Sequence, residues 1–154
     1  MKKIEKILKK RMLLLDGAMG TMIQEYNLEE QDYRGDIFAN HKSSLKGNND
    51  LLSITKPKII EKIHTQYLEA GSDIIETNTF NANKISQEDY NLENHVFDMN
   101  FQSAQIAKNA IKKFNEKSKE PKFVCGSIGP TNRTASLSPK VEDLSFRNVT
   151  FDEL

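Results

Sequence analysis

Several features that would restrict the class of protein are scarce or missing. The sequence has a single cysteine, Cys125, among its 154 residues. One cysteine excludes an internal disulfide framework, and it cannot form a multi-cysteine zinc site unaided. No apolar run approaches the roughly 20 residues that a membrane-spanning helix needs. Residues 1–11 lack the apolar core and cleavage site of a signal peptide, so we expect a cytoplasmic protein.

An excess of charge of one sign is also missing. Lys and Arg together number 22, as do Asp and Glu, so no net field would recruit nucleic acid or an anionic membrane. Phosphate-binding lysine loops, nucleophile elbows and dinucleotide-binding glycine patterns are absent too. The composition, with 37% hydrophobic and 29% charged residues, is that of an ordinary soluble domain or part of one.

Apolar patterning predicts short strands that alternate with helices. Four apolar residues in a row suit a strand buried on both faces, and a three-to-four residue spacing indicates helices. Such alternation favours parallel βαβ units. We predict helices over residues 1–11, 57–70 and 93–114, and strands over residues 12–15, 73–76 and 123–125.

Two further segments carry their own predictions. Residues 27–49 are polar and irregular, which indicates a long loop that is either functional or disordered. In the last predicted helix we expect a buried stripe spaced three or four residues apart, made of Phe97, Phe101, Ala104, Ala107, Ile111 and Phe114.

The last residues resemble the beginning of a helix. Thr150 is followed three residues later by Glu153, the spacing of an N-terminal capping box. Three strands cannot close a barrel, and an open parallel sheet would expose its edges. We therefore expect a chain that is cut rather than complete.

Three polar clusters follow the predicted strands, over residues 16–21, 76–79 and 126–133. The carboxyl ends of parallel strands lie on one side of a sheet, so these clusters should converge on a ligand site. In the first cluster, glycines would let the backbone approach a ligand, and free amides could hold a carboxylate. Asp16 either pairs with an ammonium group or caps the following helix.

The other polar residues leave alternatives open. Glu76 needs a partner or a ligand, and a loop lysine would serve as well. Asn78, Asn81 and Asn83 form a binding surface or are simply turn residues. The segment 129–134 either binds an anion or pins a loop.

Four isolated side chains look structural rather than functional. His41, His64 and His95 show no spacing for metal ligands, so we interpret them as solvated or capped histidines. Cys125 lies in an apolar strand, which favours a small core residue over a nucleophile.

Five blocks of sequence resemble the homocysteine S-methyltransferase family, in particular its cobalamin-dependent methionine synthases. The first is Leu-Leu-Asp-Gly-Ala-Met-Gly-Thr-Met, and Lys-Gly-Asn-Asn-Asp-Leu-Leu is the second. The blocks occupy residues 14–22, 46–52, 70–80, 129–136 and 146–152, so the resemblance extends over about residues 11–154.

The resemblance implies a (β/α)8 barrel, which typically needs ~250 residues or more. Residues 1–11 would then be an N-terminal helix, and residues 12–154 an incomplete, N-terminal part of the homocysteine-binding barrel. The complete enzyme would move a methyl group from methylcobalamin to homocysteine, forming methionine. Further modules would bind the cobalamin and the methyltetrahydrofolate that remethylates it, and zinc would bind the substrate sulfur as thiolate.

The resemblance also implies roles for individual residues. Asp16 would contact the substrate ammonium group, while backbone amides of Gly17, Ala18, Met19, Gly20 and Thr21 would hold its carboxylate. Glu76, Asn78 and Thr79 would line the same mouth. The family's three cysteine zinc ligands would lie beyond Leu154, and Cys125 matches none of them. We therefore expect no catalytic residue, metal ligand or bound cofactor in this chain alone.

Three hypotheses follow. The chain is the N-terminal part of a methionine synthase, or a non-catalytic remnant or binding module derived from one. Alternatively, it is a fragment of a cobalamin-independent, betaine-type homocysteine methyltransferase, which would share the Asp-Gly opening. The blocks Gly-Asn-Asn-Asp-Leu-Leu and Gly-Pro-Thr-Asn-Arg-Thr favour the cobalamin-dependent type.

Overall fold

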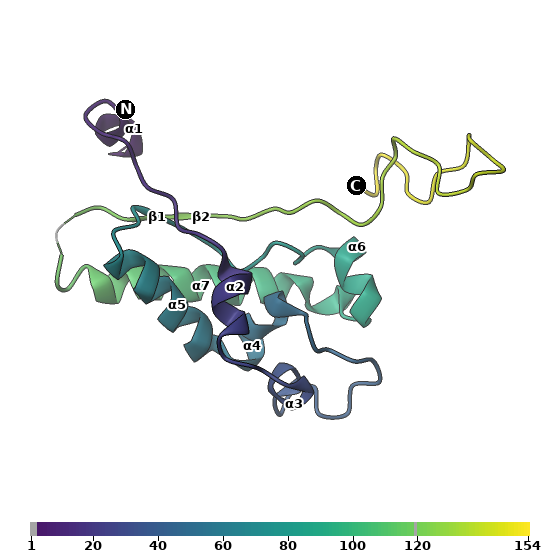
Figure 1. The fold of residues 1–154 in the computed structure, drawn as a ribbon, viewed down its shortest axis with the longest axis horizontal. Helices are drawn as coiled ribbons and strands as arrows, with labels where there is room; N and C mark the ends of the chain where they lie inside the picture. Colours follow the sequence, from purple (N-terminus) through teal and green to yellow (C-terminus); the bar gives the residue numbers. More distant parts are fainter. Residues whose placement is uncertain (1–2, 119) are drawn as a thin grey trace.

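The computed structural model of the protein describes residues 3–118 and 120–154. A two-stranded parallel sheet pairs β1 (Ile74–Glu76) with β2 (Phe123–Cys125), with Ile75 opposite Val124. Figure 1 shows the long helices α5 (Pro57–Glu69) and α7 (Val96–Phe114) on one side of this sheet. The crossover between the strands contains α7, as expected for a parallel pair.

The predictions of a helix over residues 57–70 and of strands over residues 73–76 and 123–125 are confirmed by α5, β1 and β2. Pro57 opens α5, where its missing N–H costs nothing, and Gly71 follows with a φ of +109°. That left-handed conformation is inexpensive only for glycine, so the chain turns away from the helix there. Ile60 and Ile63 are fully buried on its inner face.

The predicted buried stripe of α7 is wrong in its first half. Phe97 and Phe101 are 75% and 48% exposed, and their rings stack on each other with centroids 6.0 Å apart. Small side chains let two helices approach closely, so α7 turns its smaller residues toward α5 and the sheet. Its buried residues are Met99, Ser103, Ile106, Ala107 and Ala110.

The predicted strand over residues 12–15 is also wrong. Only Leu15 forms a single parallel bridge, to Ile74, and Leu14 and Leu15 are 59% and 52% exposed. Among the described residues no further strand pairs with this segment. Two backbone hydrogen bonds hold it beside β1, from the Asp16 amide to the Ile74 carbonyl and from the Ile74 amide to the Leu14 carbonyl. The Asp73 carboxylate adds to them by accepting hydrogen bonds from the Leu14 amide and from Arg11.

The N-terminal helix is shorter than predicted. Helix α1 covers Lys3–Leu8, and residues 9–11 form a turn and a bend after it. Residues 1–2 of the predicted helix lie outside the described residues. In Figure 1 α1 stands apart from the long helices.

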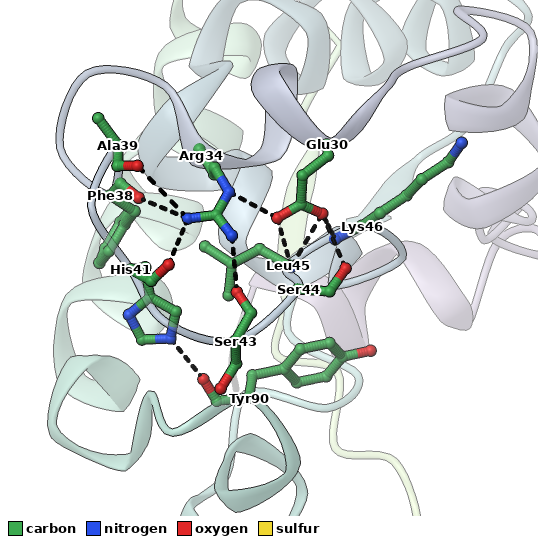
Figure 2. Close-up of polar contacts among 10 residues, drawn as sticks. All are labelled: Glu30, Arg34, Phe38, Ala39, His41, Ser43, Ser44, Leu45, Lys46 and Tyr90. Atoms are coloured by element: carbon green, nitrogen blue, oxygen red, sulfur yellow. Dashed lines mark hydrogen bonds and ion pairs between the residues drawn. The ribbon is translucent and has the colours of Figure 1, made fainter.

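Residues 27–49 are neither disordered nor without structure. They contain α3 (Glu30–Arg34), which begins with a capping box between Glu29 and Asp32. Figure 2 shows how Glu30 and Arg34 then hold the following loop through hydrogen bonds to its backbone. The prediction failed because charged side chains, rather than an apolar pattern, order this segment.

Short elements connect these parts. They are α2 (Met19–Gln24), η1 (Asn49–Leu51), α4 (Leu52–Thr55), α6 (Lys84–Gln87), η2 (Glu88–Tyr90) and η3 (Glu93–His95). Within the described ranges, no helix is long and apolar enough to cross a membrane.

The C-terminal stretch after β2 has no helix or strand in its described residues. Figure 1 shows it leading away from the helices. Half of the predicted capping box is present at its end, since the Thr150 amide donates to the Glu153 carboxylate at 2.8 Å. The Thr150 hydroxyl donates to the same carboxylate, also at 2.8 Å, whereas in a capping box it would accept from the Glu153 amide. Residues 151–153 form a turn rather than a helix.

Candidate functional site

A cavity of about 410 Å³ lies where β1 ends and α2 begins. Residues 16–20, 49–50 and 76–81, together with Ser127, line it. The first two predicted polar clusters therefore meet at this cavity, whereas the third reaches it only through Ser127. Thr21 is exposed and is not part of the wall. We call this space the Asp16 cavity.

Asp16 has one oxygen bound and one free. Its Oδ2 accepts a hydrogen bond from the Glu76 amide at 3.0 Å, while Oδ1 is buried without a partner among the described residues. Burial, reinforced by the nearby Glu76 carboxylate, raises the pKa of Asp16 to about 6, although the hydrogen bond from the Glu76 amide opposes this. Helix α2 starts after Ala18 and receives no side-chain cap, so Asp16 is not a capping residue.

Glu76 is the last residue of β1 and faces the same cavity. It forms no ion pair with a described lysine or arginine, so the predicted alternative of a loop lysine is not observed. Two neighbouring carboxylates without a cationic partner favour the binding of a positively charged group.

The backbone at the beginning of α2 offers hydrogen-bond donors. Within the described part of the chain, the amides of Gly17 and Ala18 donate to no acceptor. The Tyr67 hydroxyl donates to the Ala18 carbonyl at 3.3 Å, and a Cβ at Gly17 would lie 3.2 Å from that hydroxyl. Glycine at this position therefore lets the turn approach Tyr67 closely.

Asn78 and Thr79 are buried and hold the wall of the cavity together. The Asn78 side chain donates to the Asn49 carbonyl at 2.7 Å and to Ser53 Oγ at 3.2 Å. Thr79 Oγ1 donates to the Ser127 carbonyl at 2.8 Å, which links the end of β1 to the segment after β2. These contacts are tertiary, so turn formation alone does not account for either residue.

Comparison with known proteins identifies the family. The sequence model of the homocysteine S-methyltransferase family matches residues 13–154. The chain belongs to the homocysteine S-methyltransferase family.

Solved structures show a related fold. Crystal structures of the homocysteine methyltransferase MmuM from Escherichia coli, in metallated and oxidized forms, superimpose with TM-scores of 0.65 and 0.67. Sequence identities are 20% and 21% over 84% of this chain. The chain covers 42% and 41% of those two structures, so it spans about two fifths of the length of the enzyme that it resembles.

The residues described do not fit a zinc site, and the resemblance itself places the cysteine ligands beyond Leu154. Among residues 3–118 and 120–154, no three His, Cys, Asp or Glu side chains are grouped so that they could hold a metal ion. Cys125 is exposed rather than in the core, because it is the last residue of β2. Its thiol lies 3.7 Å from the Gly126 carbonyl. We therefore derive no chemical step through a metal bound to these residues.

The segment 129–134 pins a loop, which is one of the two predicted alternatives. Arg133 forms an ion pair with Glu88, and Asn132 donates to Asp89 at 2.9 Å. The Gly129 amide also donates to the Phe80 carbonyl at 3.0 Å. These contacts fasten the segment to η2 and to the end of the Asp16 cavity.

The histidines and the remaining asparagines have mixed outcomes. His64 is fully buried with both ring nitrogens unpartnered among the described residues, and burial lowers its pKa to about 4. The prediction of a solvated or capped histidine is wrong there, because His64 lies one turn from the buried Ile60 and Leu68. His41 Nε2 contacts the Tyr90 carbonyl at 2.7 Å. Asn83 caps α6, as expected of a turn residue.

Asn49 and Asp50 were not predicted as site residues, although both line the cavity. Asp50 is 3% exposed, and its Oδ1 accepts from the Asn81 amide at 2.9 Å. Burial raises the pKa of its carboxyl. The apolar pair Leu51–Leu52 was a signal that could have located them. Both leucines are fully buried, so the polar residues directly before them lie next to the core.

Proposed function

We propose that this chain forms the amino-acid-binding part of a homocysteine methyltransferase. The ammonium group of homocysteine would lie against Asp16 and Glu76. Its carboxylate would accept hydrogen bonds from backbone amides in the segment 17–20, and Asn78 and Thr79 would hold the wall around it. The observation that carries the proposal is the buried Oδ1 of Asp16, which has no partner among the described residues and lies beside a second carboxylate at a cavity.

The charge pattern suits an amino acid. The carboxylates of Asp16 and Glu76 line one part of the cavity, and at the beginning of α2 lie amides that have no acceptor among the described residues. A zwitterion places opposite charges on one carbon, so both groups are satisfied by one ligand of this kind. A purely anionic or purely cationic ligand would leave one set without a partner.

The proposed reaction transfers a methyl group to the homocysteine sulfur, which gives methionine. The sulfur–carbon bond forms as the bond between the methyl group and its donor breaks, and the thiol proton is lost. We propose methylcobalamin as the donor, with remethylation by methyltetrahydrofolate on other modules. The second and fourth sequence blocks, at residues 46–52 and 129–136, support this choice over betaine.

The proposed architecture is part of a (β/α)8 barrel over residues 12–154. Parallel pairing of β1 with β2, and the bridge from Leu15 to Ile74, fit the first three strand positions of such a barrel. The similarity to part of the MmuM fold supports the same arrangement. On this proposal the metal ligands of the reaction come from outside residues 1–154, and the chain alone binds homocysteine without methylating it.

Isothermal titration calorimetry with three ligands tests the binding role. We expect the chain to bind L-homocysteine, and to bind 4-mercaptobutyrate, which lacks the ammonium group, at least tenfold more weakly. Asp16→Asn should remove this preference, whereas Asp36→Asn, at an exposed aspartate, should retain it. Equal affinity of the wild-type chain for both ligands, or for L-homocysteine and L-valine, would contradict the proposal.

A further inference from the structure

Asn49 presents an unused hydrogen-bond donor at the wall of the Asp16 cavity. Its Oδ1 accepts a hydrogen bond from the Tyr33 hydroxyl at 3.0 Å. Its Nδ2 lies 3.7 Å from the position that a Cβ of Gly20 would occupy. Among the described residues this Nδ2 donates to no acceptor, although Asn49 itself is only partly exposed.

Tyr33 fixes which end of the Asn49 amide faces the cavity. An amide oxygen can only accept a hydrogen bond, whereas an amide nitrogen can only donate one. The Tyr33 hydroxyl, which donates to Oδ1, therefore holds the oxygen of the Asn49 side chain on its own side. The Asn49 Nδ2 group is therefore directed toward the beginning of α2, where the Gly17 and Ala18 amides likewise have no acceptor in the described part of the chain.

Resting on the function proposed above, we propose that Asn49 is a substrate-binding residue whose side-chain amide donates to the carboxylate of the amino acid. The cavity otherwise contains the acidic side chains of Asp16, Glu76 and Asp50, which would repel that carboxylate. A neutral amide adds a donor without adding a charge. It would also make the site selective for ligands that carry a carboxylate beside the ammonium group.

The backbone around Asn49 has a separate, structural role. Its carbonyl accepts from Asn78 at 2.7 Å. The preceding Asn48 exchanges two hydrogen bonds with the buried Gln87, at 2.7 and 3.2 Å. These contacts place the main chain, and they do not involve Asn49 Nδ2. Substitution of the side chain therefore tests ligand binding separately from the fold.

Glu30 and Arg34 are positioning residues for this part of the wall. The Glu30 carboxylate accepts from the Leu45 and Lys46 amides, at 2.9 and 2.7 Å, and from Arg34. Arg34 in turn donates to the carbonyls of His41 and Ser43. Figure 2 shows this arrangement, in which two side chains of one helical turn hold both ends of the loop.

These contacts fix the position of the backbone segment that leads to Asn49. Burial opposes ionisation of Glu30, but hydrogen bonds from Leu45, Ser44, Lys46 and Arg34 outweigh it and lower its pKa to about 2. The contacts therefore persist throughout the physiological pH range. Leu45, anchored in this way, is fully buried and lies four residues before Asn49.

Calorimetry with a matched pair of ligands tests the proposal. L-Homocysteine carries the carboxylate, and 3-aminopropane-1-thiol has the same ammonium group and thiol without it. Asn49→Asp keeps the acceptor for Tyr33 but replaces the donor with a negative charge. We expect it to weaken L-homocysteine binding about 10- to 100-fold, as loss of a hydrogen bond to a charged group does, and not to weaken binding of 3-aminopropane-1-thiol.

Controls separate this proposal from the function on which it rests. Asn40→Asp adds the same charge at an exposed position of the same loop and should leave both affinities within twofold. Failure of the wild-type chain to bind L-homocysteine would contradict the proposed function. Wild-type binding combined with an equal loss for both ligands in Asn49→Asp, or with no loss, would overturn only the role of Asn49.

A double-mutant cycle tests the positioning residues. We expect Tyr33→Phe and Glu30→Gln each to weaken L-homocysteine binding severalfold in the wild-type background. In the Asn49→Asp background, neither should cause a further loss, because the donor that they position is gone. Losses that simply add in the double variants would show that Tyr33 and Glu30 act on general stability instead.

Discussion

Replacing Asp16 with asparagine should stabilise the protein while it removes the preference for ligands that carry an ammonium group. Asp16 lies at the wall of the cavity, its Oδ1 has no partner within residues 3–118 and 120–154, and burial raises its pKa from 3.8 to about 6. Each tenfold change in proton affinity corresponds to about 1.4 kcal/mol, so the ionised form costs at most about 3 kcal/mol. Partial exposure to solvent reduces this to about 1–2 kcal/mol. Asparagine keeps an oxygen for the Glu76 amide and carries no charge.

The sign of the pH dependence follows from the direction of the pKa change. Because the pKa of Asp16 is higher in the folded state than in the unfolded state, the unfolded chain loses its proton first as pH rises. Wild-type stability should therefore fall relative to Asp16→Asn between about pH 4 and pH 6. The difference should be absent near pH 3.5 and complete above pH 7.

Urea unfolding at pH 4 and at pH 7.5 measures this difference, with Asp36→Asn as the exposed control. At pH 7.5 we expect Asp16→Asn to be more stable by about 1–2 kcal/mol, which corresponds to a rise in Tm of roughly 2–8 °C for a domain of this size. A variant that is no more stable than wild type at pH 7.5, or equally stabilised at both pH values, would refute the reasoning.

Two further predictions concern sites away from Asp16. His64→Leu removes two buried ring nitrogens that have no partner among the residues that the structure describes and should raise the free energy of unfolding at pH 7 by about 1–2 kcal/mol in chemical denaturation. Since burial lowers the pKa of His64 to about 4, the advantage of the variant should grow as pH falls from about 6.5 to 4; a constant difference would contradict this. Gly129→Ala would place a methyl group against the Phe80 carbonyl, which accepts from the Gly129 amide. We expect faster proteolysis within residues 129–134, and unchanged cleavage would show that the segment tolerates the side chain.

Local sequence patterns were sufficient to predict the elements whose beginning and end they determine. Helix α5 has proline at its first position and glycine after its end, and its apolar spacing matches the buried Ile60 and Ile63. Strands β1 and β2 are short apolar runs between turns. For such segments the pattern and the tertiary environment agree, so local reasoning was sufficient.

Tertiary contacts decided the features that the sequence did not predict. Phe97 and Phe101 fit a helical stripe, yet α7 packs with a different face, which buries Met99 and Ile106 together with Ser103, Ala107 and Ala110. The run over residues 12–15 is apolar enough for a central strand. Among the described residues, however, only Leu15 of this run pairs with β1.

The candidate site was predictable in outline only. Asp16 and Glu76 follow predicted strands, and their convergence followed from parallel topology. Asn49 was missed because its approach to the cavity depends on Glu30 and Arg34, which contact backbone groups up to 16 residues away. Contacts between side chains and distant backbone groups leave no periodic pattern in a sequence.

An NMR titration of the isotopically labelled chain with L-homocysteine tests the central claim most directly. The account predicts saturable shifts in the amide signals of Gly17, Ala18 and Glu76, which surround the Asp16 cavity. The chain has another cavity beside Ile37 and Pro57. Shifts of amide signals around that cavity would indicate a different binding site. Shifts confined to that cavity, or no saturable shift at Gly17, Ala18 and Glu76, would contradict the assignment of the Asp16 cavity as the homocysteine site.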